Sequence, residues 1–201
     1  GLFKLNKEDQ LITRMSKVTG LSDVEIKLIE HDIALNISVI VYENCNIDLI
    51  KEGQIINISD IKRKEIIGLK EINSVTVNEG HAYISSSFGI VVIDLINEEI
   101  KDTYNIINNE SLIINDCAIT NDNTIYAATS QGIYIGNNNT ILNDPSNWVL
   151  SGPNINTTQI IKNEFFGCAL YLENQESFLD VFYPSSISQP TFLDVGSVSY
   201  T

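Results

Sequence analysis

Cysteines, long apolar runs and, in the second half of the chain, basic residues are all scarce in this sequence of 201 residues. The three cysteines, Cys45, Cys117 and Cys168, are an odd number, which excludes a framework that pairs all of them within the chain. They form no CxxC pair and no cluster with histidine. We therefore predict no metal site and no cofactor, and we interpret the cysteines as small core residues.

The longest apolar run, residues 37–42, is far shorter than the ~20 residues that a membrane-spanning helix requires. No secretion signal opens the sequence, so we expect any such signal to lie outside these residues. Hydrophobic residues still make up 43% of the chain, which is enough to build a folded core. The sequence thus predicts a folded module without a membrane-spanning segment.

Basic residues are unevenly distributed. Residues 1–101 contain 11 of the 12 basic residues against 16 acids, whereas residues 102–201 contain Lys162 alone against 10 acids. The net charge of −14 would repel a phosphate backbone, which excludes nucleic acid as a natural partner. An acidic surface of this kind mainly favours solubility.

Recognisable catalytic motifs are also missing: there is no G-x-S-x-G, no H-E-x-x-H and no P-loop. Ser85–Ser87 lie near His81 in sequence, but a nucleophile and its base are defined by geometry, and serines are common in turns. Asp116 and Asp122 offer oxygens of the kind that calcium prefers, without the spacing of a known calcium loop. We interpret both groups as structural and predict that the protein is not an enzyme.

The positive evidence is an internal repeat, which has to be sought before any fold is assigned. Versions of one apolar segment begin at Gly1, Asn46, Gly89 and Gly132, with steps of 45, 43 and 43 residues, and a weaker copy lies near Ser177. A second apolar strand precedes each copy, and a third precedes that one, as in residues 72–77, 81–84 and 89–93. A more polar fourth segment follows, as in residues 99–104 and 148–150.

Turn residues separate these segments. Residues 78–80 (Asn-Glu-Gly) and 121–123 (Asn-Asp-Asn) tolerate the positive φ of tight hairpins. β-branched residues dominate the segments, and helical periodicity is weak, apart from one turn of helix predicted over residues 59–65 and capped by Ser59.

Four short antiparallel strands in about 43 residues are typical of a β-propeller blade. We predict an all-β propeller over residues 1–201, with blades anchored near Gly1, Asn46, Gly89, Gly132 and Ser177 and residues 195–200 as the first strand of another blade. Closed propellers usually have four to eight blades. An incomplete or fragmentary ring is therefore predicted, since larger rings need more chain.

Two further features are candidates for binding. Lys62, Arg63 and Lys64 form the only dense basic run, which is interpreted either as a solvated loop or as an anion contact, for example to a glycan phosphate. Trp148, the only tryptophan, is expected to pack its outer strand against a neighbouring blade, with sugar stacking as the alternative. The aligned repeats place mostly Ile, Val, Ala and Ser along the central channel, which argues against a propeller enzyme.

The chain resembles the PorZ-type N-terminal propeller of the type IX secretion system. The resemblance is carried by residues 42–50, 55–63, 88–94, 99–104 and 125–129 and extends over roughly residues 1–182. The pattern that starts at Gly20-Leu21-Ser22 is similar, more broadly, to the two-component-regulator propeller repeat. The chain departs from the PorZ pattern in an Asn-rich loop at residues 105–110, where glycines are expected.

The resemblance implies a scaffold that is surface-exposed, extracellular or periplasmic, and associated with the outer membrane. It implies binding to peptidase-like and outer-membrane proteins of the secretion system, and to anionic lipopolysaccharide. The alternative is a periplasmic glycan-sensing propeller of a two-component-type regulator, because similar repeats build those sensors.

Overall fold

The computed structural model describes residues 2–5, 9–107, 112–137, 139–151, 154–162, 167–173, 176–182 and 192–197, with side chains up to residue 161. It confirms the all-β prediction, because four four-stranded antiparallel sheets and one two-stranded sheet follow one another along the chain. No helix in the described part is long and apolar enough to cross a membrane.

Each sheet is a propeller blade or part of one. The two-stranded sheet, called the half-blade here, contains β1 (Leu2–Leu5) and β2 (Ile12–Met15), and the 3-10 turn η1 (Lys17–Thr19) follows it. The first complete blade contains β3 (Ile26–Asp32), β4 (Ile37–Tyr42), β5 (Ile47–Lys51) and β6 (Gln54–Ile58), followed by the helical turn α1 (Asp60–Arg63).

The remaining blades repeat this order. The second blade contains β7 (Ile72–Asn78), β8 (His81–Ser86), β9 (Gly89–Asp94) and β10 (Glu99–Tyr104). The third contains β11 (Ile114–Ile119), β12 (Thr124–Thr129), β13 (Gly132–Asn137) and β14 (Trp148–Ser151), with η2 (Pro145–Asn147) before β14. The fourth contains β15 (Thr157–Lys162), β16 (Gly167–Glu173), β17 (Glu176–Phe182) and β18 (Phe192–Ser197).

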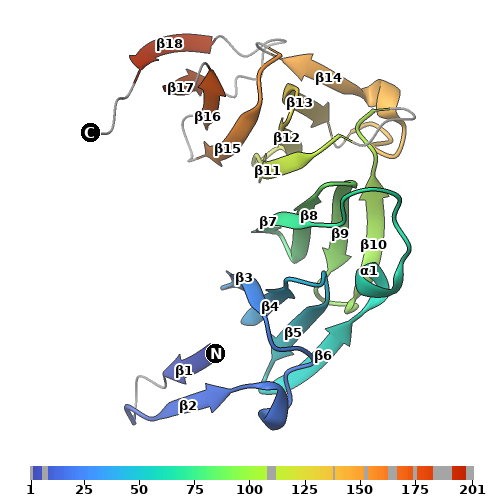
Figure 1. The fold of residues 1–201 in the computed structure, drawn as a ribbon, viewed down its shortest axis with the longest axis vertical. Coiled ribbons are helices and arrows are strands. Elements are labelled where there is room, and N and C mark those ends of the chain that lie inside the picture. Colours follow the sequence, from blue (N-terminus) through green and yellow to red (C-terminus); the bar gives the residue numbers. More distant parts are fainter. Residues whose placement is uncertain are drawn as a thin grey trace.

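The blades form an arc (Figure 1). The first strands β3, β7, β11 and β15 lie along its inner side, and the half-blade and the fourth blade lie at its two ends. No strand of the described residues joins these ends, which agrees with the predicted incomplete ring. That residues 1–201 form a single propeller domain remains a prediction.

Two local predictions were wrong. The segment expected to start another blade, residues 195–200, is not a first strand in its described part, because β18 pairs antiparallel with β17 as the outer strand of the fourth blade. The helical turn falls where it was predicted, but the Ser59 side chain makes no capping hydrogen bond. With φ −97° and ψ 5°, Ser59 lacks the extended backbone from which such a cap usually forms.

Apolar side chains pack between neighbouring blades. The largest cluster joins the first and second blades and includes Val39, Val41, Ile84 and Ile93, none of which is more than 1% exposed. A second cluster joins the second and third blades around Tyr83, Ile90 and Ile119. Strands packed on both faces need apolar residues on both faces, which explains the continuous apolar runs of β4 and β9.

A β-bulge recurs at the same place in every first strand. The register with the second strand shifts between Ile26 and Leu28, and in the same way between 72 and 74, 114 and 116, and 157 and 159. The extra residue is Lys27, Asn73, Asn115 or Thr158. Because a bulge adds local twist and re-aims a side chain, its repetition in the first three complete blades orients one side chain toward the next blade.

Two of these bulge residues make the same contact. The Asn73 side-chain amide donates to the carbonyl of Ile114 at 2.8 Å, and the Asn115 amide donates to the carbonyl of Thr157 at 2.7 Å. Lys27 occupies the same position in the first blade and reaches the Glu71 carboxylate of the second blade at 2.5 Å. The bulge residue thus links each of the first three complete blades to the blade that follows it.

Candidate binding surface at the loop face

The two ends of the strands form two faces of the arc. We call one of these ends the loop face. It carries the turns between second and third strands, which are residues 42–47, 86–89 and 129–132. It also carries the connections between blades, which are residues 16–25, 59–71 and the described part of 105–113. Backbone hydrogen bonds join these turns to the connections between blades: Glu43 N–H donates to the Glu25 carbonyl, Ser87 N–H to the Glu71 carbonyl, and Ser130 N–H to the Ile113 carbonyl. Connections that join rigid strands are where propellers and similar scaffolds place binding residues.

In the second and third blades the turn follows one plan. The Ser86 hydroxyl donates to the Gly89 carbonyl at 2.6 Å and accepts from Phe88 N–H, and Thr129 repeats both contacts with Gly132 and Gln131. Gly89 has φ +122°, and a Cβ there would lie 2.5 Å from the Tyr104 carbonyl oxygen. The glycine that marks the repeat in the sequence is therefore required by this close approach.

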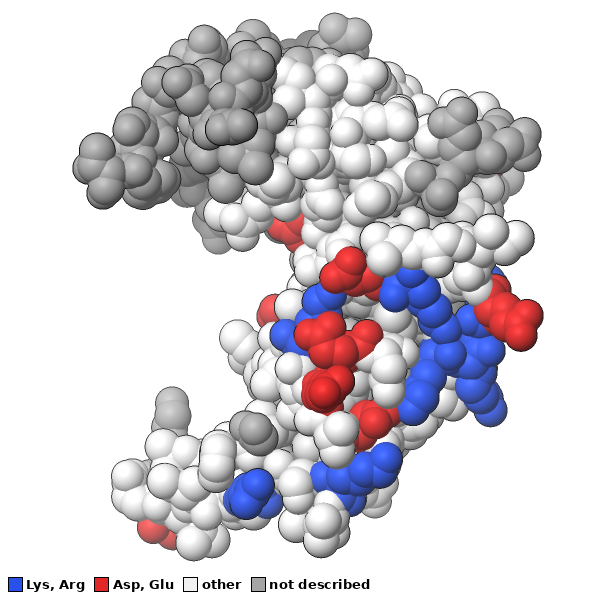
Figure 2. Space-filling view, in the orientation of Figure 1, with Lys and Arg blue, Asp and Glu red and all other residues white. Residues whose placement is uncertain are grey.

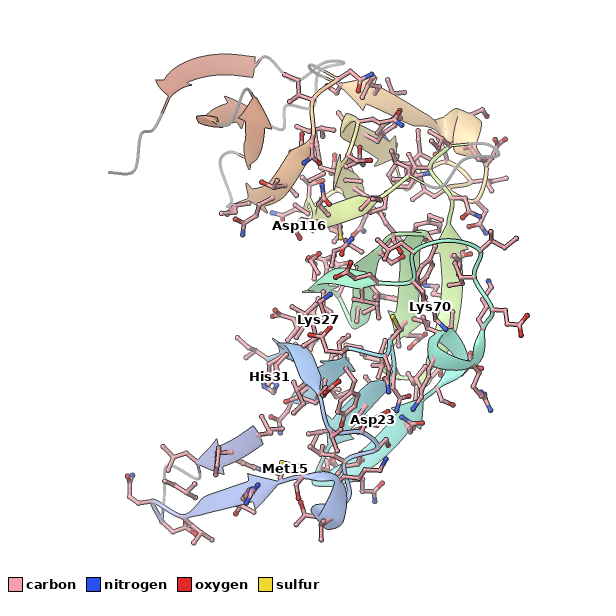
Figure 3. All side chains as sticks on the ribbon, in the orientation of Figure 1. Met15, Asp23, Lys27, His31, Lys70 and Asp116 are labelled. Carbon is pink, nitrogen blue, oxygen red and sulfur yellow. The ribbon has the colours of Figure 1, made fainter. Side chains whose placement is uncertain are left out.

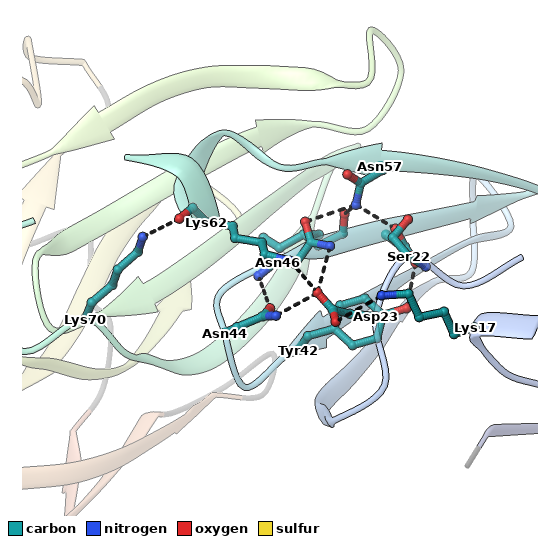
Figure 4. A network of polar contacts seen from close by, with 11 residues as sticks. Lys17, Ser22, Asp23, Tyr42, Asn44, Asn46, Asn57, Lys62 and Lys70 are labelled. Carbon is teal, nitrogen blue, oxygen red and sulfur yellow. Dashed lines mark hydrogen bonds and ion pairs between the residues drawn. The ribbon is translucent and has the colours of Figure 1, made fainter. Parts of the chain in front are cut away.

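The first complete blade has a polar network instead (Figure 4). The Asp23 carboxylate accepts from Lys62 Nζ and Asn44 Nδ2, each at 2.6 Å. Asp48, which is fully buried, accepts from the Tyr42 hydroxyl at 2.6 Å and from Ser22 N–H at 2.8 Å.

Asn57 completes this network. Its amide donates to Asp48 at 2.9 Å and to the Asn46 side chain at 3.0 Å. Every carboxylate of the network has several donors, as buried charges require.

The network changes two ionisation equilibria. The hydrogen bond from Lys62, followed by that from Asn44, lowers the pKa of Asp23 from 3.8 to about 2. Burial, together with the hydrogen bond to Asp48, raises the pKa of Tyr42 well above 10. Both groups thus keep one charge state across the physiological range, which is typical of a structural cluster.

The predicted basic run is divided by the structure. Lys62 is engaged by Asp23, and Arg63 forms an exposed ion pair with Asp60 at 3.2 Å. The Lys64 ammonium forms no hydrogen bond or ion pair with the described residues, while the Lys64 and Lys62 carbonyls accept from Lys70 Nζ at 2.8 and 2.6 Å. Figure 2 shows basic side chains gathered on the right of the view, where Figure 1 places α1, with acidic side chains beside them.

The other predicted candidates are placed apart from one another. His81 begins β8 and Ser86 ends it, so roughly 13 Å of strand separates His81 from Ser85. Ser86 closes the turn through Gly89, and Ser87 donates to the Leu69 carbonyl at 2.6 Å, so both have structural roles. His31 contacts the Ser38 hydroxyl at 3.0 Å. Among the described residues no three His, Cys, Asp or Glu side chains are grouped to hold a metal ion.

Asp116 and Asp122 also lie apart. Asp122 accepts from the Thr120 hydroxyl in the turn after β11, whereas Asp116 lies near the start of β11 and accepts from Cys117 N–H and from Ile160 N–H of the fourth blade. Burial raises the pKa of the Asp116 carboxyl. Figure 3 shows Asp116 on the inner side of the arc.

The inner side is more polar than the repeats predicted. The first strands line a hollow of about 420 Å³ that includes Glu30, Asp116 and Gln159 beside apolar side chains. Ile, Val, Ala and Ser make up six of the twelve residues that line the hollow, so the prediction of mostly these residues holds only in part.

Cysteine and tryptophan predictions are confirmed where side chains are described. Cys45 and Cys117 are free and buried, and burial raises the pKa of both thiols, that of Cys117 to about 12. The side chain of Cys168 lies outside the described residues. Trp148 is buried, donates its indole N–H to the Leu142 carbonyl at 2.9 Å and lies 6.2 Å from the Tyr104 ring of the second blade. It packs one blade against another, as predicted.

Several functional features were not anticipated from sequence. The bulge contacts of Asn73 and Asn115 were missed, although both residues follow an isoleucine at the same position of the repeat. The network around Asp23 and Asp48 joins residues that are distant in sequence and carry no motif. In the Asn-rich loop, residues 108–110 lie outside the described residues.

Fold and surface together define a β-propeller protein whose connections between blades are gathered on one face. The chain belongs to the PorZ N-terminal β-propeller domain family of the type IX secretion system, whose sequence profile matches residues 1–149. No curated protein sequence matches it.

A solved structure of PorZ from Porphyromonas gingivalis, described as an essential bacterial surface component of the type IX secretion system, has the same fold. It is 23% identical with a TM-score of 0.79 over 97% of this chain. The chain spans 26% of that protein's length.

Proposed function

We propose that this propeller is a non-catalytic scaffold of a type IX secretion attachment complex at the bacterial surface. The observation that carries the proposal is membership of the PorZ N-terminal propeller family over residues 1–149. The solved relative, described as a bacterial surface component, supports a location at the outer membrane. Its partners are peptidase-like and outer-membrane proteins of the same system.

The connection between the first and second blades is the surface we assign to partner binding. Its two ends are fixed: Ile61 is buried in the core, and Lys70 Nζ holds the carbonyls of Lys62 and Lys64. Between these anchors Ile67 is fully exposed and Leu69 is 58% exposed. A firmly based loop that presents apolar side chains suits protein recognition, because little ordering is needed on binding.

The basic residues beside this loop supply the anion contact. Lys64 is free to bind an anion, and Arg63 can exchange its exposed pairing with Asp60 at little cost, since surface ion pairs are weak. Lys62 has a structural role through Asp23. The anion is a phosphate group of lipopolysaccharide, and Lys64 and Arg63 carry the contact.

The test uses the whole protein, with and without Ile67→Ser and Lys64→Glu. Co-purification of peptidase-like and outer-membrane proteins of the secretion system is expected to fall about tenfold for Ile67→Ser, as for loss of an apolar interface residue. Ile33→Ser is the matched control, because Ile33 is 87% exposed in the β3–β4 hairpin at the opposite end of the strands.

Lys64→Glu is expected to weaken binding to purified anionic lipopolysaccharide and to reduce its salt dependence. Wild-type protein that co-purifies with none of these components would overturn the scaffold proposal. If Ile67→Ser and Ile33→Ser reduced co-purification equally, the loop that carries Ile67 would not be the partner-binding surface.

A further inference from the structure

The hollow on the inner side of the arc, called the inner hollow here, is built from one repeated segment. Each first strand contributes three successive residues to it, beginning with the first paired residue after the bulge: 28–30, 74–76, 116–118 and 159–161. The middle residues are all apolar, namely Ile29, Val75, Cys117 and Ile160. The residues directly after the bulge differ in every blade, namely Leu28, Ser74, Asp116 and Gln159. Repeated blade packing therefore explains the middle position but not the variable one.

At the variable position of the third blade, the Asp116 carboxylate has accepting capacity that the fold does not use. Its Oδ1 accepts from Cys117 N–H at 2.9 Å, and its Oδ2 accepts from Ile160 N–H at 3.2 Å. An ionised carboxylate can accept about four hydrogen bonds. None of the ion pairs among the described residues includes Asp116. A carboxylate that is partly buried without a cation is stabilised when a cation reaches it.

The Ser74 hydroxyl, at the variable position of the second blade, also has hydrogen-bonding capacity left. Burial raises the pKa of Asp116, and the nearby Ser74 hydroxyl opposes that shift. Ser74 Oγ is nevertheless buried and makes no hydrogen bond of ordinary geometry with the described residues. Because buried hydroxyls in proteins are normally hydrogen-bonded, the hydroxyl and the carboxylate together indicate a place for an additional polar group.

The described lining of the inner hollow defines the chemistry of that group. It contains no Lys, Arg or His to hold an anion, and no aromatic ring on which a sugar or a quaternary ammonium group could stack. Its polar side chains include two carboxylates, Glu30 and Asp116, on different blades. Its walls include Ile29 and Ile161, which are 50% and 58% exposed. Carboxylates beside exposed aliphatic side chains suit a primary ammonium group on an aliphatic stem.

We propose that the inner hollow binds a lysine side chain of a partner peptide. The ammonium group lies at Asp116, with Glu30 adding to its attraction, and the stem covers Ile29 and Ile161. The volume of about 420 Å³ falls within the range of small-ligand sites, and the net charge of −14 favours the approach of a cation. The site is separate from the loop face, where the partner-binding loop and Lys64 lie.

The experiment titrates the whole protein with the acetylated and amidated tripeptide Ala-Lys-Ala and follows binding by NMR. The same tripeptide with norleucine in place of lysine keeps the aliphatic stem but lacks the ammonium group. It is expected to bind at least about tenfold more weakly, because the charged hydrogen bonds are lost.

Asp116→Asn is expected to weaken binding of the lysine peptide about tenfold. Asp122→Asn is the matched control, since it removes the same charge from a turn outside the lining and is expected to leave the affinity unchanged. Thermal unfolding shows whether both variants are folded. Glu30→Gln provides a second variant in the hollow, with an expected loss of about threefold, as for a partly screened charge.

Equal affinities for the lysine and norleucine peptides, or no binding of either, would overturn the proposal. Equal losses for Asp116→Asn and Asp122→Asn would also overturn it, because the attraction would then come from the overall charge. Ile67→Ser is expected to bind the lysine peptide like the wild-type protein. Failure of the scaffold proposal at the loop face would therefore be distinguished from failure of the site in the inner hollow.

Discussion

The turn between second and third strands is built in one way in the first complete blade and in another way in the two blades that follow it. In the second and third blades a Ser or Thr hydroxyl and a glycine close the turn. In the first blade the turn is longer, Cys45 adopts φ +62°, and Asn44, Asn46 and Asp48 provide the hydrogen bonds. Asp48 occupies the position of Val91 in the second blade, so a buried charge replaces an apolar side chain.

The difference follows from what each blade must hold. The second and third blades are fixed by apolar clusters on both sides. The first blade has only a small apolar cluster toward the half-blade, and its loop end must also fix the connection at residues 16–25 and the turn α1. Asp23 and Asp48 do this by accepting hydrogen bonds from Lys62 and from Ser22. Polar networks specify one arrangement where apolar packing is incomplete.

The largest expected effect tests the glycine turn. Gly89→Ala should lower the free energy of unfolding by about 4 kcal/mol, because it combines positive φ with a backbone clash. Urea denaturation measures this. Gly53→Ala is the control, since Gly53 has φ +81° but no atom within 4 Å of a Cβ. Equal losses of unfolding free energy in the two variants would mean that the close approach of residue 89 to the Tyr104 carbonyl does not contribute to the destabilisation.

Next comes the polar network. Asp48→Ala should destabilise the protein by about 3 kcal/mol, since the Tyr42 hydroxyl and the Asn57 amide would lose their buried acceptor. Val91→Thr, at the equivalent position of the second blade, should cost only about 1–2 kcal/mol. Thermal unfolding of the two variants compares the blades directly. A tolerated Asp48→Ala would show that the network does not stabilise the first blade.

The bulge contacts should matter less. Asn73→Ala and Asn115→Ala should each cost about 1–2 kcal/mol, because a buried carbonyl of the next blade loses its donor. Hydrogen exchange of the following first strand would report the loss locally. If the two variants differed widely, the repeated contact would not have a common role.

The smallest effect depends on pH. Because the pKa of Asp23 is lowered to about 2 from 3.8, its stabilisation is complete above about pH 4 and is lost as the pH falls through 2. Asp23→Asn should therefore cost about 1 kcal/mol at pH 7, after allowance for the partly exposed Lys62, and almost nothing near pH 2. Urea midpoints at both values measure this. A constant difference would exclude the ion pair as its source.

Much of the fold was predictable because each blade repeats a local pattern. The copies beginning at Asn46, Gly89 and Gly132 correspond to β5, β9 and β13, and their spacing predicted four strands per unit. Residues 195–200 were misassigned because a short segment does not by itself show which strand it pairs with, and pairing with β17 identifies its described part as a fourth strand. The basic run was visible in the sequence, but its division between Asp23, Asp60 and solvent was not.

By itself the sequence determined the class of fold, the length of the repeat and the positions of its turns, because alternation, β-branching and glycine act over a few residues. Tertiary structure alone decided which side chains face the inner side, how one blade is linked to the next, and where an apolar surface is left uncovered. Those properties depend on contacts such as Asn73 with Ile114 and Lys62 with Asp23, which join residues roughly 40 apart in the chain. Local sequence preferences carry no information about which distant groups will meet.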